Sequence, residues 1–181
     1  MVDAYVDAKV TQIKKIGQGT RVCLDFIDVL AADEGVCVGN TGHGYVTVLS
    51  ENRQTDTYPP RPFRVNVGAH HQYVKGLSQA THYATEIKPG DVIPIYSLNG
   101  EREVSVGRVK KEKRDFFWIE AETENQAVVS TTLQQADSVH LLTPNGPVNV
   151  LDLTIGATIC VVLDTAGRHL GQQIDEAIEE Q

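Results

Sequence analysis

The segment Tyr58–Val74 holds the densest set of side chains that could bind or transform a substrate. It reads YPPRPFRVNVGAHHQYV. Arg61 and Arg64 are suited to bidentate capture of a carboxylate or a phosphate group. His70 and His71 could transfer protons near neutral pH or bind a metal ion. The segment therefore predicts either a substrate-binding loop or a surface loop whose charged side chains form salt bridges.

Side-chain direction limits which of these groups can act together. On an extended backbone, Arg64, Asn66 and Gly68 share one face of the chain. The adjacent residues His70 and His71 point to opposite faces, so at most one of them should face a given pocket.

A second group of polar and small residues lies upstream, in Asp33–Gly44. It reads DEGVCVGNTGHG, with one carboxylate pair, four glycines and one histidine. A glycine-rich turn can aim backbone N–H groups at an anion. The spacing matches neither GxGxxG nor the P-loop, and no long helix follows. The alternative is a hairpin turn between strands at Val36–Val38 and Tyr45–Ser50.

A third group, Asp164–Gly171, lies where a strand is expected to give way to a helix. The N-terminus of a helix favours anions, and Arg168 and His169 would add to that preference. The alternative is a tight turn with two solvated side chains.

The elements that must position these groups are strands, because apolar residues mostly recur with period two or run in short blocks. The Gly171–Gln181 segment differs: Ile174 and Ile178 lie four residues apart among acidic residues, which predicts a short C-terminal α-helix. The sequence therefore predicts an all-β, Greek-key-like β-barrel or pair of barrels with that helix. The expected strands are Ala8–Ile16, Arg21–Phe26, Val36–Val38, Tyr45–Ser50, Arg64–Val67, Thr81–Glu86, Asp91–Ser97, Glu103–Lys110, Asp115–Thr123, Gln126–Thr132, Ser138–Thr143, Val148–Asp152 and Thr158–Leu163.

Turn signals separate these strands, among them Gly17–Gly19 and Pro144–Gly146. Asn99–Gly100 predicts a type I′ hairpin, because both of its central residues tolerate a positive φ. We expect a first β segment, 1–85, with the Arg/His-rich loop, and a second barrel-like segment, 86–181, with the helix. The two segments could be fused into one domain, since no Gly/Ser-rich or Pro-rich linker separates them.

Composition indicates a soluble globular chain. Hydrophobic residues make up 41% and charged residues 22% of its 181 residues, which is too apolar for disorder. No apolar run approaches the roughly 20 residues that span a bilayer. Cys23, Cys37 and Cys160 have no CxxC spacing, so we expect buried free thiols rather than a zinc ribbon or disulfides. A reducing cytoplasm is the expected location.

The formal charge of −8 argues against a nucleic-acid partner. The basic residues concentrate only in Arg108–Arg114, where Glu112 interrupts them. A solvated edge strand, whose lysines discourage pairing with other strands, explains this stretch.

Several of these motifs, in this order along the chain, resemble the archaeal-type (class II) 3-dehydroquinate synthases. The resemblance covers the chain from about Ala8 onward, and the run RPFRVNVGA is its most specific part. The matching motifs are Arg21–Asp25 (RVCLD), Glu34–Gly39 (EGVCVG), Arg61–Tyr73 (RPFRVNVGAHHQY), Val106–Lys110 (VGRVK), Leu133–Gln134 (LQ) and Gly167–Gly171 (GRHLG).

The resemblance implies a specific reaction in the shikimate pathway of aromatic amino-acid biosynthesis. These enzymes take 2-amino-3,7-dideoxy-D-threo-hept-6-ulosonate and oxidatively deaminate its amine-bearing carbon with NAD. An aldol step then closes the ring and gives 3-dehydroquinate. The expected small-molecule partner is therefore this amino keto acid, and NAD is the expected cofactor.

Side-chain chemistry assigns expected roles within that reaction. His71, Tyr73 and Lys110 are the candidate catalytic residues, because each could move a proton. The candidate substrate-binding residues are Arg61, Arg64, Asn66 and Arg168. The candidate cofactor-binding residues are Gly39, Asn40 and Gly42. A divalent metal would be held by Glu34, His71 and His169.

The chain resembles only the C-terminal half of these enzymes, which are about twice its length. It could be a natural short protein, a subunit that works with an N-terminal-half partner, or an expressed domain; a homo-oligomer is also expected. Two other function classes stay open. One is a related cyclase or aromatase that forms a 3-amino-4-hydroxybenzoate-type product. The other is a non-catalytic β-barrel that binds an anion or a partner chain.

Overall fold

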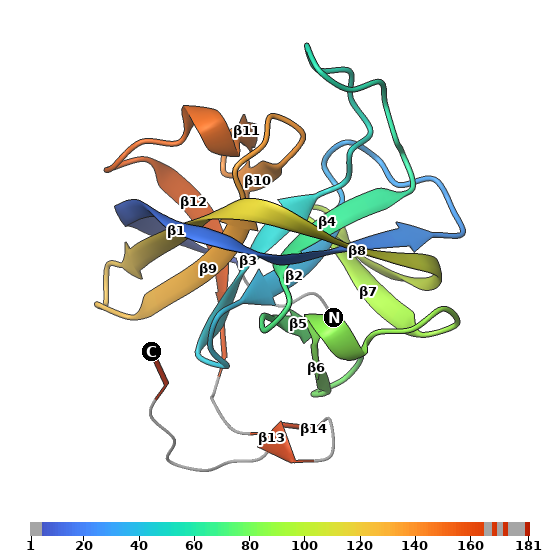
Figure 1. Cartoon of the computed structure of the whole chain (residues 1–181). Coiled ribbons are helices and arrows are strands. Elements are labelled where there is room, and N and C mark those ends of the chain that lie inside the picture. Colours follow the sequence, from blue (N-terminus) through green and yellow to red (C-terminus); the bar gives the residue numbers. More distant parts are fainter. Residues whose placement is uncertain (1–4, 165–167, 170–171, 174–179) are drawn as a thin grey trace.

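Strands make up nearly all of the regular structure, which confirms the predicted all-β class. The computed structural model describes residues 5–164, 168–169, 172–173 and 180–181 (Figure 1). Two short 3₁₀ helices, η1 (Ala84–Glu86) and η2 (Val150–Asp152), interrupt the strands. The strands are β1 (Val6–Phe26), β2 (Gly35–Gly39), β3 (Gly44–Leu49), β4 (Arg64–Ala69), β5 (Tyr73–Lys75), β6 (Thr81–Tyr83), β7 (Val92–Ser97), β8 (Gly100–Thr123), β9 (Val128–Gln134), β10 (His140–Thr143), β11 (Gly146–Asn149), β12 (Thr158–Leu163), β13 (Arg168–His169) and β14 (Gln172–Gln173).

Two unusually long strands, β1 and β8, form the backbone of the sheet. They pair antiparallel from Ala8↔Thr123 to Phe26↔Val106. The sequence predicts two shorter strands in place of each, with a turn at Gly17–Gly19. The structure instead has a β-bulge there, because the register shifts between Lys15 and Gly17, and Gly17 takes φ +102°. A glycine bulge bends a strand without ending it.

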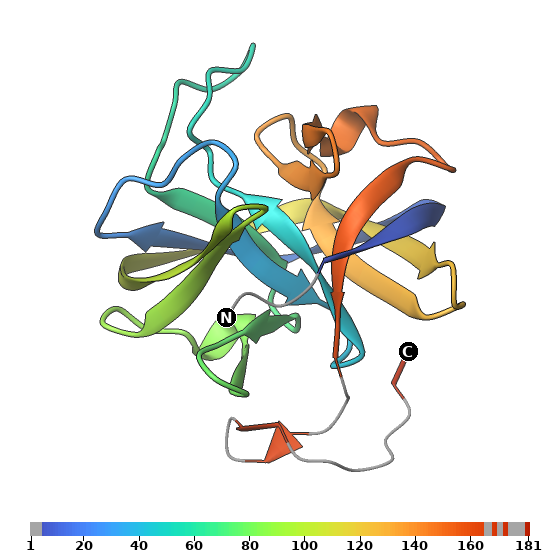
Figure 2. The ribbon, with the colours of Figure 1, turned by 180° about the vertical axis from the view of Figure 1, so that it is seen from behind.

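The strand pairings close into a ring. Six strands follow one another around it, in the order β3, β12, β1, β8, β7 and β2, and β2 pairs again with β3. The hairpin of β2 and β3 lies between β7 and β12 (Figure 2). Strands β4 and β9 branch from β1 and β8. Strands from the expected segments 1–85 and 86–181 therefore share one hydrogen-bonded sheet, and the division between the segments stays a prediction.

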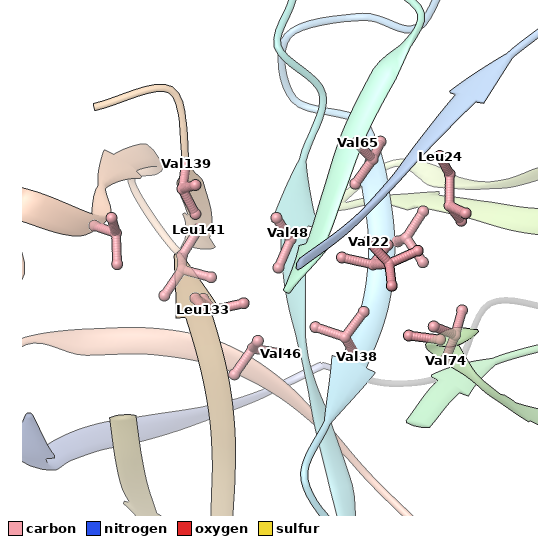
Figure 3. Packing of buried hydrophobic residues seen from close by; sticks show 14 of the residues in the cluster. Val22, Leu24, Val38, Val46, Val48, Val65, Val74, Leu133, Val139 and Leu141 are labelled. Atoms are coloured by element: carbon pink, nitrogen blue, oxygen red, sulfur yellow. The ribbon is translucent and has the colours of Figure 1, made fainter. Parts of the chain in front are cut away.

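A core of branched aliphatic side chains fills the interior. Val38, Val48, Leu133 and Leu141 lie within it (Figure 3) and are fully buried. β-branched residues pack well on a pleated sheet, which explains why valine dominates. The three cysteines are free and buried, as predicted. The described residues contain no helix that is long and apolar enough to cross a membrane.

Two local predictions need correction. The hairpin between β7 and β8 exists, but its two-residue loop is Leu98–Asn99, closed by the Ser97↔Gly100 pair, and neither loop residue has a positive φ. The type I′ geometry is therefore wrong. Within the predicted C-terminal helix, residues 172–173 form strand β14, which pairs with β13. Residues 180–181 are not helical either, and the rest of that prediction, at 171 and 174–179, lies outside the described residues.

Candidate functional site

A row of polar side chains on β9 contacts several of the candidate site residues. Thr132 and Gln134 are two residues apart on β9, so they share a face and lie about 7 Å from each other. Thr132 contacts the glycine-rich turn after β2, and Gln134 contacts β1 and β4. These contacts form two hydrogen-bonded groups, one around Asn40 and one around Gln134, that are neighbours on β9. Together we call them the β9 network; its members are Arg21, Asn40, Asn66, His71, Ser130, Thr132 and Gln134.

His71 lies at one end of the β9 network. Its Nε2 is 2.8 Å from Asn40 Oδ1, which also accepts a hydrogen bond of 2.7 Å from Thr132 Oγ1. The Asn40 amide nitrogen donates to Ser130 Oγ at 3.2 Å. Partial burial of the ring, helped by the nearby His70, lowers the pKa of His71 below its usual value. The neutral ring can therefore accept a proton near neutral pH.

The turn after β4 places His71 against Asn40. Gly68 takes φ +82°, and a Cβ there would lie 2.3 Å from the Thr132 carbonyl oxygen, so only glycine fits. Gln72 is fully buried and holds the turn against β9. Its Nε2 donates to the Val67 carbonyl, and its Oε1 accepts from Thr131 Oγ1 and the Thr132 N–H, each at 2.8 Å.

Gln134 organises the other end of the β9 network. Its Oε1 accepts hydrogen bonds of 2.8 Å from both Arg21 Nη1 and Asn66 Nδ2. Arg21 also forms an ion pair with Glu112 on β8, which in turn bonds Arg114 at 3.0 Å. The buried Nε of Arg21 has no hydrogen-bond partner among the described residues.

A charged triplet lies beside this end of the network, across β4, β1 and β8. Asp25 faces Arg64 on one side and Arg108 on the other. It accepts hydrogen bonds of 2.8 and 3.1 Å from Arg64 and one of 2.7 Å from Arg108. Burial raises the pKa of Asp25, but the hydrogen bonds from the two arginines outweigh burial and leave the pKa below its usual value.

The same three strands place Lys110 near the network. Cys23 pairs with Asn66 on β4 and with Lys110 on β8, and directly paired residues share a face of the sheet. Lys110 is half-buried. The predicted residues Asn66 and Lys110 therefore lie on one polar face with the triplet.

The two arginines predicted to clamp a substrate already have carboxylate partners. Arg64 pairs with Asp25, as described above. Arg61 donates to Glu51 at 2.8 Å through Nε and stacks over the Tyr58 ring. Burial raises the pKa of Glu51, and Arg61 only partly offsets that effect. Both arginines thus take part in internal ion pairs, and their role as a substrate clamp stays a prediction.

Tyr73 contacts the chain close to its last described residues. Its hydroxyl donates to Glu180 Oε2 at 2.8 Å, and the Gly42 N–H donates to the other carboxylate oxygen at 2.7 Å. The Tyr73 ring stacks on Tyr83, with centroids 5.2 Å apart. Burial and the bond to Glu180 raise the pKa of Tyr73. A backbone N–H and a phenol therefore converge on one carboxylate here.

A cavity of about 900 Å³ opens beside these contacts. Ser130 of the network lines it, together with Thr41, His43 and Glu180. The buried Nδ1 of His43 has no hydrogen-bond partner among the described residues. The volume is within the range of small-molecule sites.

Comparison with known proteins decides the family. The model of the 3-dehydroquinate synthase II C-terminal domain matches residues 7–181. This chain belongs to that family. The resemblance drawn from the motifs is thereby confirmed.

Individual relatives agree with the family match. The 3-dehydroquinate synthase of Halobacterium salinarum is 42% identical over 179 residues, which cover 98% of this chain and 46% of the relative. That of Methanospirillum hungatei is 42% identical, over 94% of this chain and 52% of the relative. The 3-dehydroquinate synthase homolog of Aquifex aeolicus is 38% identical, over 97% of this chain and 53% of the relative. The chain therefore spans about half the length of these relatives. No solved structure matches it significantly.

The residues predicted to bind a cofactor do not fit a dinucleotide in this 3-dehydroquinate synthase II domain. Gly39, Asn40 and Gly42 form the turn of the β2–β3 hairpin, which was the alternative interpretation. A Cβ at Gly39 would lie 2.3 Å from the Gly44 carbonyl oxygen, so this glycine serves the tight turn. The Asn40 amide is occupied by its internal bonds, and among the described residues no helix follows the turn to bind a pyrophosphate.

The predicted metal ligands are not brought together either. Glu34 precedes β2 and pairs with Arg102 at 2.8 Å, while His71 contacts Asn40 at the other end of β2. Six extended residues separate Glu34 from Asn40, or about 20 Å. No group of three metal-ligating side chains exists among the described residues. Arg168 and His169 lie in β13, and their side chains are outside the described part of the chain.

Sequence reasoning missed several members of the site. Gln72, Ser130 and Thr132 carry no motif, and Gln134 entered only as part of a matching dipeptide. Their long-range partners are 59 to 113 positions away in the chain. The one available signal was a run of polar residues, Ser130–Thr132, at the end of the predicted strand Gln126–Thr132, with Gln134 two residues beyond it.

Proposed function

We propose that this chain forms part of the substrate site of a type II 3-dehydroquinate synthase. The reaction we propose converts 2-amino-3,7-dideoxy-D-threo-hept-6-ulosonate, NAD and water into 3-dehydroquinate, ammonia, NADH and a proton. Membership of the family and the names of the relatives support this proposal.

The chemistry of that substrate determines which groups the active site must supply. After the amine-bearing carbon has become a ketone, a proton must leave the terminal methyl carbon next to the second ketone. The resulting enolate then forms the ring-closing carbon–carbon bond, and the attacked ketone oxygen takes up a proton. A site therefore needs a neutral base, a proton donor and cationic groups for the substrate carboxylate.

The single observation that carries the proposal is the β9 network. It joins His71, a base with a lowered pKa, to a polar face that holds Arg21 and Lys110. This basic face stands out because the whole chain has a net charge of −8. A neutral imidazole and cationic side chains that are linked through one strand suit an anionic substrate that must lose a proton.

We propose the following roles for individual residues. His71 accepts the proton from the carbon next to the ketone. Lys110, which is half-buried, and Arg108, whose side chain is exposed although it also pairs with Asp25, attract the substrate carboxylate. Tyr73 orders the turn through Glu180 and donates a proton only after that contact opens.

NAD would accept the hydride in the oxidation step, but the predicted residues Gly39, Asn40 and Gly42 do not fit it, so we derive no step through the dinucleotide. The NAD dependence of the proposal rests on the family resemblance alone. The expected N-terminal-half partner, homo-oligomer and cytoplasmic location also stay predictions.

A turnover assay of the natural protein that contains these 181 residues tests the proposal. The amino heptulosonate and NAD are supplied, with and without Mg²⁺. The proposal predicts equal amounts of NADH, ammonia and 3-dehydroquinate. An aromatic product without NADH would overturn it in favour of the related cyclase, and consumption of neither reactant would overturn it altogether.

A further inference from the structure

Asn40 holds His71 through an atom that can only accept hydrogen bonds. Its Oδ1 lies 2.8 Å from His71 Nε2 and already accepts from Thr132 Oγ1 at 2.7 Å. An amide oxygen has no proton to give, so the ring nitrogen that faces it must be the donor. The contact therefore selects one of the two neutral forms of the ring.

We propose that Asn40 is a positioning residue, which keeps the proton of neutral His71 on Nε2 and leaves the Nδ1 lone pair to accept a proton from substrate. This inference rests on the proposed function for its chemical purpose. Its geometry does not depend on that function.

The orientation of the Asn40 side chain is fixed by its surroundings. The residue is only 9% exposed, and its backbone N–H donates to the Ser130 carbonyl at 2.8 Å. Its amide nitrogen donates to Ser130 Oγ, on the opposite side from Thr132 and His71. β9 thus supplies partners to both ends of the amide, which can present its oxygen to the histidine.

An amide suits this position better than a carboxylate would. A carboxylate next to a histidine stabilises the charged ring and raises its pKa by about 1–3 units. An amide orients the ring without adding charge, so the histidine stays neutral and available as a base. The lowered pKa of His71 agrees with this arrangement.

The ring nitrogen that does not face Asn40, Nδ1, is the one that would react. His71 is exposed, and no described residue forms a hydrogen bond with its Nδ1. In the proposed step the C–H bond next to the substrate ketone breaks, and its electron pair stays on the substrate as the enolate. The proton moves to Nδ1, which makes the ring an imidazolium, and later leaves to the oxygen formed in ring closure.

Nitrogen NMR of the ¹⁵N-histidine-labelled 181-residue chain tests the inference without any substrate. At a pH above the pKa of the ring, we expect His71 only in the form protonated on Nε2. The exposed neighbour His70 should show a mixture of both forms in the same spectrum and so serves as an internal reference. A His71 signal protonated on Nδ1, or a mixture like that of His70, would overturn the inference.

Matched variants separate positioning from folding. Asn40→Ala should return His71 to the mixture seen for His70, whereas Asn145→Ala, at an exposed asparagine outside the β9 network, should leave the Nε2-protonated form unchanged. Asn40→Asp should raise the pKa of His71 by about 1–3 units, measured in the same spectra. If the pKa of His71 is unchanged in the Asn40→Asp variant, the side chain at position 40 does not contact the His71 ring, and the inference is wrong. If turnover fails while these spectra agree, the proposed function is wrong and the positioning stands.

Discussion

At the scale of single residues, Asp25 is the buried charge on which the arginine-rich face depends. Replacing it by alanine removes the carboxylate that accepts the side-chain hydrogen bonds of Arg64, which is 8% exposed. Breaking a buried ion pair in this way costs about 3–5 kcal/mol of unfolding free energy. Chemical denaturation of Asp25→Ala measures the loss. Asp28→Ala, which breaks an exposed pair with Arg102, is the matched control and should leave stability unchanged; equal effects of both variants would contradict the account.

The same carboxylate predicts a pH dependence of stability. The folded pKa of Asp25 lies below its unfolded value, so its contribution is fully present above the unfolded pKa of about 3.9. The contribution is lost as the pH falls through the folded pKa. As the pH is lowered, the free energy of unfolding should therefore fall more steeply for the native chain than for the Asp25→Asn variant. If the free energies of unfolding of the two proteins fall in parallel at low pH, Asp25 contributes nothing to the pH dependence of stability.

Residue types could be predicted from the sequence better than residue partners. Arg64, Asn66 and His71 stood out by type, and all three lie on or beside the polar face. The internal ion pair of Arg64 with Asp25 could not be foreseen, because 39 positions separate them and only the β1–β4 register joins them. The role of Gln72 could not be predicted, because no sequence pattern marks a glutamine that will be buried.

At the scale of elements, the approach of β4 to β9 depends on Gly68. Gly68→Ala combines a strained positive φ with a Cβ only 2.3 Å from the Thr132 carbonyl oxygen. The matched control is Gly90→Ala, which has a similar φ but open space around the new Cβ. A positive φ alone costs about 1–2 kcal/mol. Thermal denaturation should show a clearly larger loss for Gly68→Ala, and equal losses would mean that β4 and β9 are not in close contact.

The elements also show where sequence patterns mislead. Period-two alternation located most strands, and Thr158–Leu163 matches β12 residue for residue. Turn residues were less informative. Gly17, for example, was predicted to lie in a turn that ends a strand, but it forms a bulge within β1. A glycine with positive φ serves either purpose, and only the partner strand decides which one occurs.

At the scale of the whole molecule, β1 and β8 run through the entire sheet and should make unfolding cooperative. Both expected segments, 1–85 and 86–181, contribute strands to the same closed ring. We predict one transition in denaturant, with coincident curves from the fluorescence of the single tryptophan, Trp118, and from circular dichroism. Two separate transitions would instead support two independently folding units.

The central claim is that the β9 network and its polar face bind the substrate of a 3-dehydroquinate synthase. The most direct measurement is an NMR titration of the ¹⁵N-labelled 181-residue chain with 3-dehydroquinate, the product of the proposed reaction. The account predicts saturable shifts at His71, Asn40 and Lys110, which weaken in Lys110→Ala. Shifts confined to the separate cavity lined by Tyr5 and Glu122, or no saturable shift at all, would contradict it.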